Sequence, residues 1–186
     1  MYYQLSTFYK RDIYFQYAEE NSILYDAFEK GESVDFKKEI IYLIDKIDDY
    51  LNDYDILPTY NTPLVSSKFM NLFKNHEKEV QFLKATIIDK KGNRNNTYYV
   101  PNILNMVPCL DKERSIIEEK KYGSASIMTI KKLYITPNSI QDFSIIRMKE
   151  KKSYIIVTEE FKRRCEDAKL KGFNFIEEGH SIYKDI

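Results

Sequence analysis

The sequence predicts an α+β fold, with a mostly antiparallel sheet, two short strand-helix-strand units and an N-terminal amphipathic helix. Apolar residues recur at helical spacing between residues 36 and 51, which predicts that helix. Residues 64–73 and 155–168 each join an extended apolar run to a short amphipathic helix. A chain of 186 residues is long enough for one hydrophobic core, so we expect a single domain over residues 1–186.

Residues 1–56 form the N-terminal part of this expected domain and contain its acidic helix. Residues 2–28 are rich in tyrosine and phenylalanine and predict a short strand, with a helical stretch over residues 22–29. The clearest helix follows, and Ser33 or Asp35 can cap it by accepting a backbone N–H. Its predicted buried face consists of Phe36, Ile40, Leu43, Ile44, Ile47 and Leu51.

Residues 57–186 form the predicted α+β core, and a hairpin is its longest expected element. Val80–Asp89 reads as a strand, residues 91–93 supply a glycine turn, and Asn96–Val100 returns as the partner strand. Further extended segments are expected at residues 103–110, 126–135, 143–148, 154–157 and 173–177. The core is therefore expected to be a sheet with short helices packed on it.

The two short helices have similar start signals. Ser66 and Thr158 are suited to cap them, and Gly172 is placed to end the second one. If both helices pack on a common sheet, four side chains on their apolar faces are buried: Phe69, Phe73, Phe161 and Cys165.

Composition excludes several classes of protein. Hydrophobic residues make up 43% and charged residues 31% of the chain, which is an ordinary globular balance. Twenty-nine basic residues cancel twenty-nine acidic ones, which argues against a surface built wholly for nucleic acid or an anionic membrane. The start of the chain lacks the apolar stretch of a secretory signal, and no run is long and apolar enough to span a bilayer. We therefore expect a cytoplasmic protein with no membrane association.

No catalytic or metal-binding signature is present in the sequence. Cys109 and Cys165 lack C-x-x-C spacing, and His76 and His180 are too far apart to suggest a shared site. Glycine-rich phosphate loops and the motifs of serine hydrolases and zinc proteases are missing. The sequence thus predicts a protein that is not an enzyme and needs no cofactor.

Charge is distributed unevenly along the chain. Residues 17–60 contain twelve acids and four bases, a balance of −8, whereas residues 61–186 contain sixteen acids and twenty-three bases, a balance of +7. The acidic residues predicted to contact a partner are Asp45, Asp48, Asp49, Asp53 and Asp55. They would attract a basic partner by electrostatic steering, but internal docking of this segment on the basic half of the chain explains the pattern as well.

Two basic segments keep a nucleic-acid interpretation open as an alternative. Residues 149–152 contain three lysines, and Arg163 and Arg164 are adjacent. Without a recognisable nucleic-acid-binding motif, this alternative, a nucleic-acid-binding or regulatory module, is less favoured. A small hydrolase is the third choice.

Three stretches together resemble the immunity-protein family of bacterial polymorphic toxin systems. Residues 65–69 (Val-Ser-Ser-Lys-Phe) resemble the start of that family's first helix, Val-Ser-Glu-Lys-Leu. Residues 98–111, followed by Ser115, are similar to its tyrosine-rich strand and the segment Asn-Val-Val-Asp-Cys-Leu-Asp. Residues 146–175 are similar to its Phe-Arg-Leu-Lys segment, second helix and closing strand. The departures are Ser67, Pro108 and Ile146, where the family usually has glutamate, aspartate and phenylalanine.

The resemblance implies a protein that neutralises a cognate toxin by stoichiometric occlusion and carries out no chemistry. The implied partner is a protein toxin, and the acidic segment suits a basic surface such as a nuclease groove presents. The recurring polar residues of the resemblance are expected to be structural rather than to bind the toxin: Asn105, Asp111, Ser115 and Arg147.

Overall fold

The computed structural model describes residues 1–35, 37–60, 62–123 and 125–180. The described part contains thirteen β-strands, two α-helices and two short 3₁₀ helices, so the fold is strand-rich and the α+β prediction is wrong. The strands are β1 Tyr2–Thr7, β2 Gln16–Tyr17, β3 Ile40–Ile44, β4 Ile56–Leu57, β5 Leu64–Ser66, β6 Val80–Asp89, β7 Arg94–Ile103, β8 Met106–Val107, β9 Ile116–Tyr122, β10 Ala125–Lys132, β11 Ile145–Met148, β12 Ile155–Thr158 and β13 Phe173–Glu177. The helices are η1 Tyr25–Glu29, η2 Leu51–Asp53, α1 Ser67–Phe73 and α2 Glu159–Asp167.

A six-stranded sheet has the order β2-β3-β6-β7-β5-β4. The predicted hairpin is confirmed in its centre, where β6 pairs with β7 from Val80 opposite Ile103 onward. β3 pairs with β6 in parallel, with Ile40 opposite Ala85 and Ile44 opposite Asp89. The N-terminal part of the chain thus completes a sheet whose centre comes from the later part.

The predicted N-terminal helix does not form. Ile40, Tyr42 and Ile44 are buried while Leu43 is 37% exposed, which is the two-residue alternation of a strand. Parallel pairing with β6 satisfies this backbone, and the β-branched isoleucines pack well on a pleated surface. Ser33 and Asp35 therefore cap no helix there. Phe36, the first residue of the predicted apolar face, lies outside the described residues.

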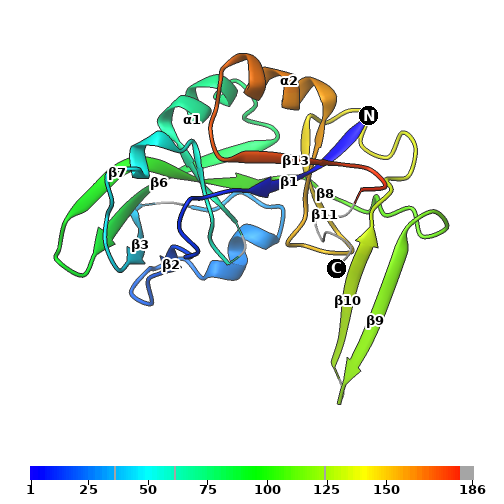
Figure 1. The fold of residues 1–186 in the computed structure, drawn as a ribbon, viewed down its shortest axis with the longest axis horizontal. Coiled ribbons are helices and arrows are strands. Elements are labelled where there is room, and N and C mark those ends of the chain that lie inside the picture. The colour runs from blue at the N-terminus through cyan, green and yellow to red at the C-terminus, as the bar shows by residue number, and fades with distance from the viewer. Residues whose placement is uncertain (36, 61, 124, 181–186) are drawn as a thin grey trace.

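A five-stranded sheet has the order β13-β1-β12-β11-β8. β1 lies between β12 and β13 and pairs antiparallel with both, with Tyr3 opposite Val157 on one side and Glu177 on the other. Figure 1 shows β1 next to β13, although they come from opposite ends of the chain. Residues 2–7 are therefore an interior strand of this sheet.

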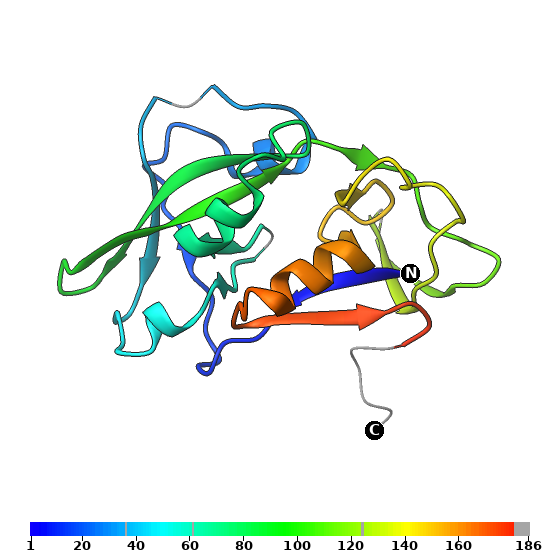
Figure 2. The same ribbon diagram turned by 90° about the horizontal axis from the view of Figure 1, so that it is seen from above.

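Both short helices begin where the sequence predicts. Ser66 caps α1 by accepting a hydrogen bond from the Phe69 N–H, and Thr158 caps α2 by accepting from the Phe161 N–H. Figures 1 and 2 show the two helices on the same side of the molecule. The four side chains predicted to be buried are all at most 2% exposed: Phe69, Phe73, Phe161 and Cys165. No helix in the described part is long and apolar enough to cross a membrane.

The hairpin of β9 and β10 forms a two-stranded sheet of its own. Figure 1 shows it extending away from the two larger sheets. At its base, Ile130 is buried, and Ile117 and Met128 pack against the same hydrophobic cluster. Farther out, Ile127 is 55% exposed. The sequence predicts β10 but not β9, because the four consecutive charged residues at positions 118–121 lack the alternating apolar pattern typical of a strand.

Gly172 is required where α2 turns back toward β13. Its φ is +89°, and a Cβ atom there would lie 3.0 Å from the carbonyl oxygens of both Phe8 and Ile56. We expect Gly172→Ala to lower the free energy of unfolding by more than the ~1–2 kcal/mol that a positive φ alone costs, because the backbone contacts cannot relax cheaply. Thermal or denaturant unfolding measures the difference.

Gly92 provides the matched control for that substitution. Its φ is +82°, but a Cβ atom would meet nothing within 4 Å. Gly92→Ala should therefore show the backbone cost alone. Equal losses for the two variants would mean that the close approach at Gly172 contributes nothing to stability.

Candidate partner-binding surface

The acidic residues of the predicted binding site lie on the segment that leads from β3 to β4. Asp45 follows the last residue of β3, and Asp53 ends η2. Because no long helix is present in the described part of this segment, the five aspartates do not share one helix face. Their side chains instead have different surroundings: some are exposed, and others are held in hydrogen bonds within the chain.

Asp45 and Asp48 are both bound by Arg11. Arg11 Nη2 lies 2.6 Å from Asp45 Oδ2, and Arg11 Nη1 lies 3.0 Å from Asp48 Oδ2. The Tyr9 hydroxyl also donates a hydrogen bond to Asp48 at 2.9 Å. The hydrogen bonds from Arg11 lower the pKa of Asp45, so this carboxylate stays charged well into acidic solution. Part of the acidic charge is therefore neutralised within the chain.

Asp55 connects two parts of the fold. Its Oδ1 accepts from the Ser66 hydroxyl at 2.6 Å, and its Oδ2 accepts from the Lys171 N–H at 2.9 Å. Its own N–H donates to the Lys171 carbonyl oxygen at 2.8 Å. These bonds join the start of α1 to the turn after α2, so Asp55 has a structural use.

Asp49 and Asp53 are exposed, and so is Asp45 despite its ion pair. These three carboxylates are the members of the predicted set that a partner can reach most directly. Asp48 and Asp55 are half-buried and hydrogen-bonded inside the chain.

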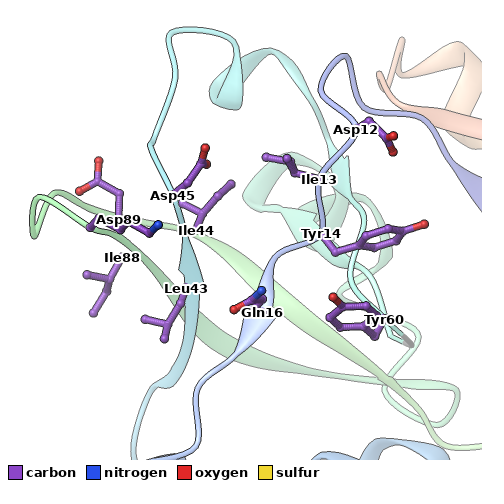
Figure 3. A pocket seen from close by; sticks show the side chains of 11 residues that line it. Asp12, Ile13, Tyr14, Gln16, Leu43, Ile44, Asp45, Tyr60, Ile88 and Asp89 are labelled. Atoms are coloured by element: carbon purple, nitrogen blue, oxygen red, sulfur yellow. The ribbon is translucent and has the colours of Figure 1, made fainter.

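A depression of about 680 Å³ lies next to Asp45. It is bounded by the segment before β2, the end of β3 and the end of β6, and Figure 3 shows its side chains. Leu43 and Ile88 supply apolar surface, and Asp12 supplies a second exposed carboxylate. The depression therefore combines apolar and acidic groups.

Two tyrosines form an exposed stack at one side of the depression. The rings of Tyr14 and Tyr60 lie 5.2 Å apart, only 13° from parallel, and the residues are 51% and 67% exposed (Figure 3). A parallel bridge between Phe15 and Thr59, which are both buried, brings the neighbouring tyrosines together at the surface. Ordered aromatic surface of this kind is typical of binding sites, because it is buried with little loss of conformational entropy.

Asp89 is the third carboxylate in the lining, but it is engaged in its own turn. It accepts hydrogen bonds from the Asn93 side chain at 2.9 Å and from the backbone N–H groups of Asn93, Lys91 and Ile47. The bond from the Asn93 side chain is the largest of several causes that lower the pKa of Asp89 to about 2. Asp12, and Asp45 with its bound Arg11, therefore remain exposed at the depression, and Lys90 is the one lysine or arginine among its described lining residues.

One cluster away from the depression combines a serine, a histidine and a glutamate. His76 Nδ1 lies 3.1 Å from Glu79 Oε1 and 3.3 Å from the Ser144 hydroxyl. On the other side of the ring, Arg164 Nη1 lies 2.6 Å from His76 Nε2. Although burial opposes ionisation, hydrogen bonds from His76, Ser144 and Ile145 lower the pKa of Glu79.

This cluster has the wrong geometry for a catalytic triad. A guanidinium has no acceptor, so Nε2 of His76 must accept from Arg164 and Nδ1 must carry the hydrogen. Ser144 therefore faces the protonated nitrogen, which cannot take its proton. The cluster instead ties the turn after α1 to α2 and β11, and sequence spacing gave no sign of it.

Some basic side chains of the segments that suggested nucleic-acid binding form hydrogen bonds within the protein. Lys151 Nζ donates to the Met128 carbonyl oxygen at 2.8 Å, and Arg164 Nη2 donates to the Leu72 carbonyl oxygen at 2.7 Å. The Glu150 carboxylate accepts from the N–H groups of Cys109 and Leu110. Among residues 1–35, 37–60, 62–123 and 125–180, no group of three metal-binding side chains is found.

The recurring polar residues make the contacts expected of structural groups. Asp111 accepts from the Glu113 and Arg114 N–H groups, and Ser115 exchanges hydrogen bonds with the Tyr134 backbone. The Asn105 side chain donates to the Lys78 carbonyl oxygen. Their polar atoms thus hold loops together.

Arg147 is completely buried on β11. Its guanidinium donates to the Lys152 carbonyl oxygen and, at 2.9 Å, to the Thr62 hydroxyl. Its Nε has no hydrogen-bond partner among the described residues, and burial lowers the pKa of the group. The charge is therefore held inside the protein by only two neutral acceptors in the described part.

The tyrosine pair and Asp12 were not predicted as binding residues. Tyr14 and Tyr60 are 46 positions apart, and only the folded structure, through the bridge between Phe15 and Thr59, brings them together. The available signal was weak: a polar, tyrosine-rich segment near the start of the chain.

Comparison with known proteins supports the resemblance found in the sequence. No curated protein matches the chain. A family model described as an immunity protein family (Imm11) matches residues 45–180, which include the segment from β3 to β5, both α-helices and the β9–β10 hairpin. Because this match covers well over half of the 186 residues, the chain belongs to the Imm11 immunity protein family.

Proposed function

We propose that this chain binds a cognate protein toxin of a polymorphic toxin system and neutralises it by stoichiometric occlusion in the cytoplasm. Membership of an immunity protein family is the observation that carries the proposal, because immunity implies a toxin partner. The chain acts without catalysing a reaction, and residues 1–186 function as one domain.

The depression beside Asp45 is the proposed contact surface. Tyr14 and Tyr60 provide exposed aromatic area, which is often the most important part of a protein interface. Asp12 and Asp45 at the depression, and Asp49 and Asp53 beyond it, would speed encounter with a basic surface such as a nuclease groove. Asp48 and Asp55 would act indirectly, by holding this segment in place.

A nucleic-acid-binding module is the less supported alternative. Lys151 and Arg164 are engaged in internal hydrogen bonds. Retention on mixed nucleic acid that falls with added salt would favour this alternative. A tight 1:1 complex with a protein would favour immunity.

Replacing both Tyr14 and Tyr60 by alanine is expected to weaken toxin binding by about tenfold or more, because it removes the two stacked and exposed aromatic rings of the proposed contact surface. The candidate toxin is the product of the neighbouring reading frame, purified in an inactivated form. Calorimetry gives the affinity and stoichiometry, and growth of cells that express the active toxin gives the protection.

Ile127→Ala is the control, since Ile127 is also a large exposed apolar residue, 55% exposed, but lies on the β9–β10 hairpin and does not line the depression. It should leave binding unchanged. If the tyrosine variant, folded like the wild type, bound as tightly as the control, the depression would not be the contact surface. If the wild-type chain gave neither a 1:1 complex nor protection, the proposed function itself would be wrong.

A further inference from the structure

The β9–β10 hairpin leaves one strand edge free. In the described part, β9 pairs only with β10. The other edge, along β10, is partly covered, because Lys151 donates a hydrogen bond to the Met128 carbonyl oxygen. A free edge exposes N–H and C=O groups that pair readily with another strand, and a two-stranded hairpin gains stability when a strand is added.

The charges on β9 are arranged so that the strand complements a reversed copy of itself. Along the chain, two glutamates at positions 118 and 119 are followed by two lysines at positions 120 and 121. Side chains alternate between the faces of a strand, so Glu118 and Lys120 share one face, and Glu119 and Lys121 share the other. On each face the acid precedes the base. An antiparallel copy runs in the opposite direction and therefore places its bases beside these acids.

We propose that two copies of this chain associate by antiparallel pairing of β9 with β9 about a two-fold axis. The product is a four-stranded sheet in the order β10-β9-β9-β10. If the axis passes through Glu119, Glu118 of each copy lies opposite Lys120 of the other. If it passes through Lys120, Glu119 of each copy lies opposite Lys121 of the other. Such an interface is self-complementary, as a two-fold dimer requires.

Either register also leaves one like-charged pair on the axis. In the first register this pair is Glu119 with its copy, and Lys121 of the other chain lies diagonal to it, within reach of a long side chain. In the first register, exposed apolar residues lie on the same face as the ion pairs: Ile116 is 50% exposed, and Ile127 lies opposite Lys120 across the hairpin. Lysine stems from the second copy can cover part of this apolar surface.

This association is separate from toxin binding. Figure 1 shows the hairpin far from β2 and β3, which border the depression with Tyr14 and Tyr60. A dimer through β9 therefore leaves both depressions open. The inference does not depend on the proposed function, because the oligomeric state is measured without a toxin.

Charge reversal on β9 tests the pairing. Sedimentation of the full chain over a range of concentrations should show a monomer-dimer equilibrium for the wild type. Glu118→Lys and Lys120→Glu should each weaken the dimer by about tenfold or more, because like charges then lie opposite each other. An equal mixture of the two single variants should dimerise again, since the lysine introduced in one chain then lies opposite the glutamate introduced in the other.

A second set, Glu119→Lys and Lys121→Glu, tests the other register in the same way. Lys112→Glu, an exposed charge change outside the hairpin, is the control and should leave the dimer intact. Circular dichroism verifies that each variant is folded. A wild type that stays monomeric at all concentrations would overturn the proposal. So would single variants that dimerise like the wild type in both sets, or mixtures that fail to restore the dimer in the set that loses it.

Discussion

Replacing Phe161 by alanine is expected to lower the free energy of unfolding by about 3 to 5 kcal/mol. The Phe161 side chain is 1% exposed, and its ring stacks on Phe73 with centroids 4.3 Å apart. Phe69 contacts the same ring at a centroid distance of 6.0 Å. Since these rings join α1 to α2, the cavity left by alanine cannot close without moving a helix. Denaturant unfolding followed by circular dichroism measures the loss.

Arg163→Ala is the control in the same helix, because Arg163 is exposed. It should change the free energy of unfolding by no more than about 0.5 kcal/mol. If Phe161→Ala were as mild as this control, the packing of the two helices on each other would not hold the fold together.

Replacing Thr62 by valine is expected to cost about 1.5 to 3 kcal/mol of stability, because the buried guanidinium of Arg147 then loses one of its two acceptors. Valine has nearly the shape of threonine, so the loss reports the hydrogen bond rather than a cavity. Thr136→Val at an exposed position is the control and should be close to neutral. Thermal unfolding of the purified variants gives the comparison.

A double-mutant cycle with Arg147→Met isolates this contact. Once the guanidinium is removed, Thr62→Val no longer leaves a buried N–H donor without an acceptor. The substitution should therefore lower the free energy of unfolding much less than it does in the wild type. An equal cost in both backgrounds would show that the bond between Thr62 and Arg147 adds nothing to stability.

Local signals in the sequence predicted local structure well. The capping residues Ser66 and Thr158 each have their hydrogen-bond partner three residues away, and the β6–β7 hairpin is specified by its own turn. The burial of Phe161 and Cys165 followed from helical spacing over a few residues. Each of these features starts from a signal between residues that are close together in the sequence: a cap, a turn or the spacing of one short helix.

The prediction of an N-terminal helix was wrong because the conformation of residues 40–44 is decided by pairing with a strand that is distant in the sequence. Residues 40–44 are a short apolar run that fits a helix face and a buried strand equally well. Their strand conformation depends on β6, about 45 positions later, which no local pattern reveals. The same limit applies to the proposed contact surface, since Tyr14 and Tyr60 meet only through tertiary structure.

The interior position of β1 has a consequence for how the protein is made. β1 begins at Tyr2, but its neighbours β12 and β13 begin at Ile155 and Phe173, so they leave the ribosome much later than β1 does. At the usual rates of synthesis of about 5 to 20 residues per second, β1 waits on the order of ten seconds for these strands. During that interval both of its edges are open to wrong partners on the nascent chain or on other chains. The five-stranded sheet therefore closes only after translation has passed β13, and a newly made copy has its final structure only then.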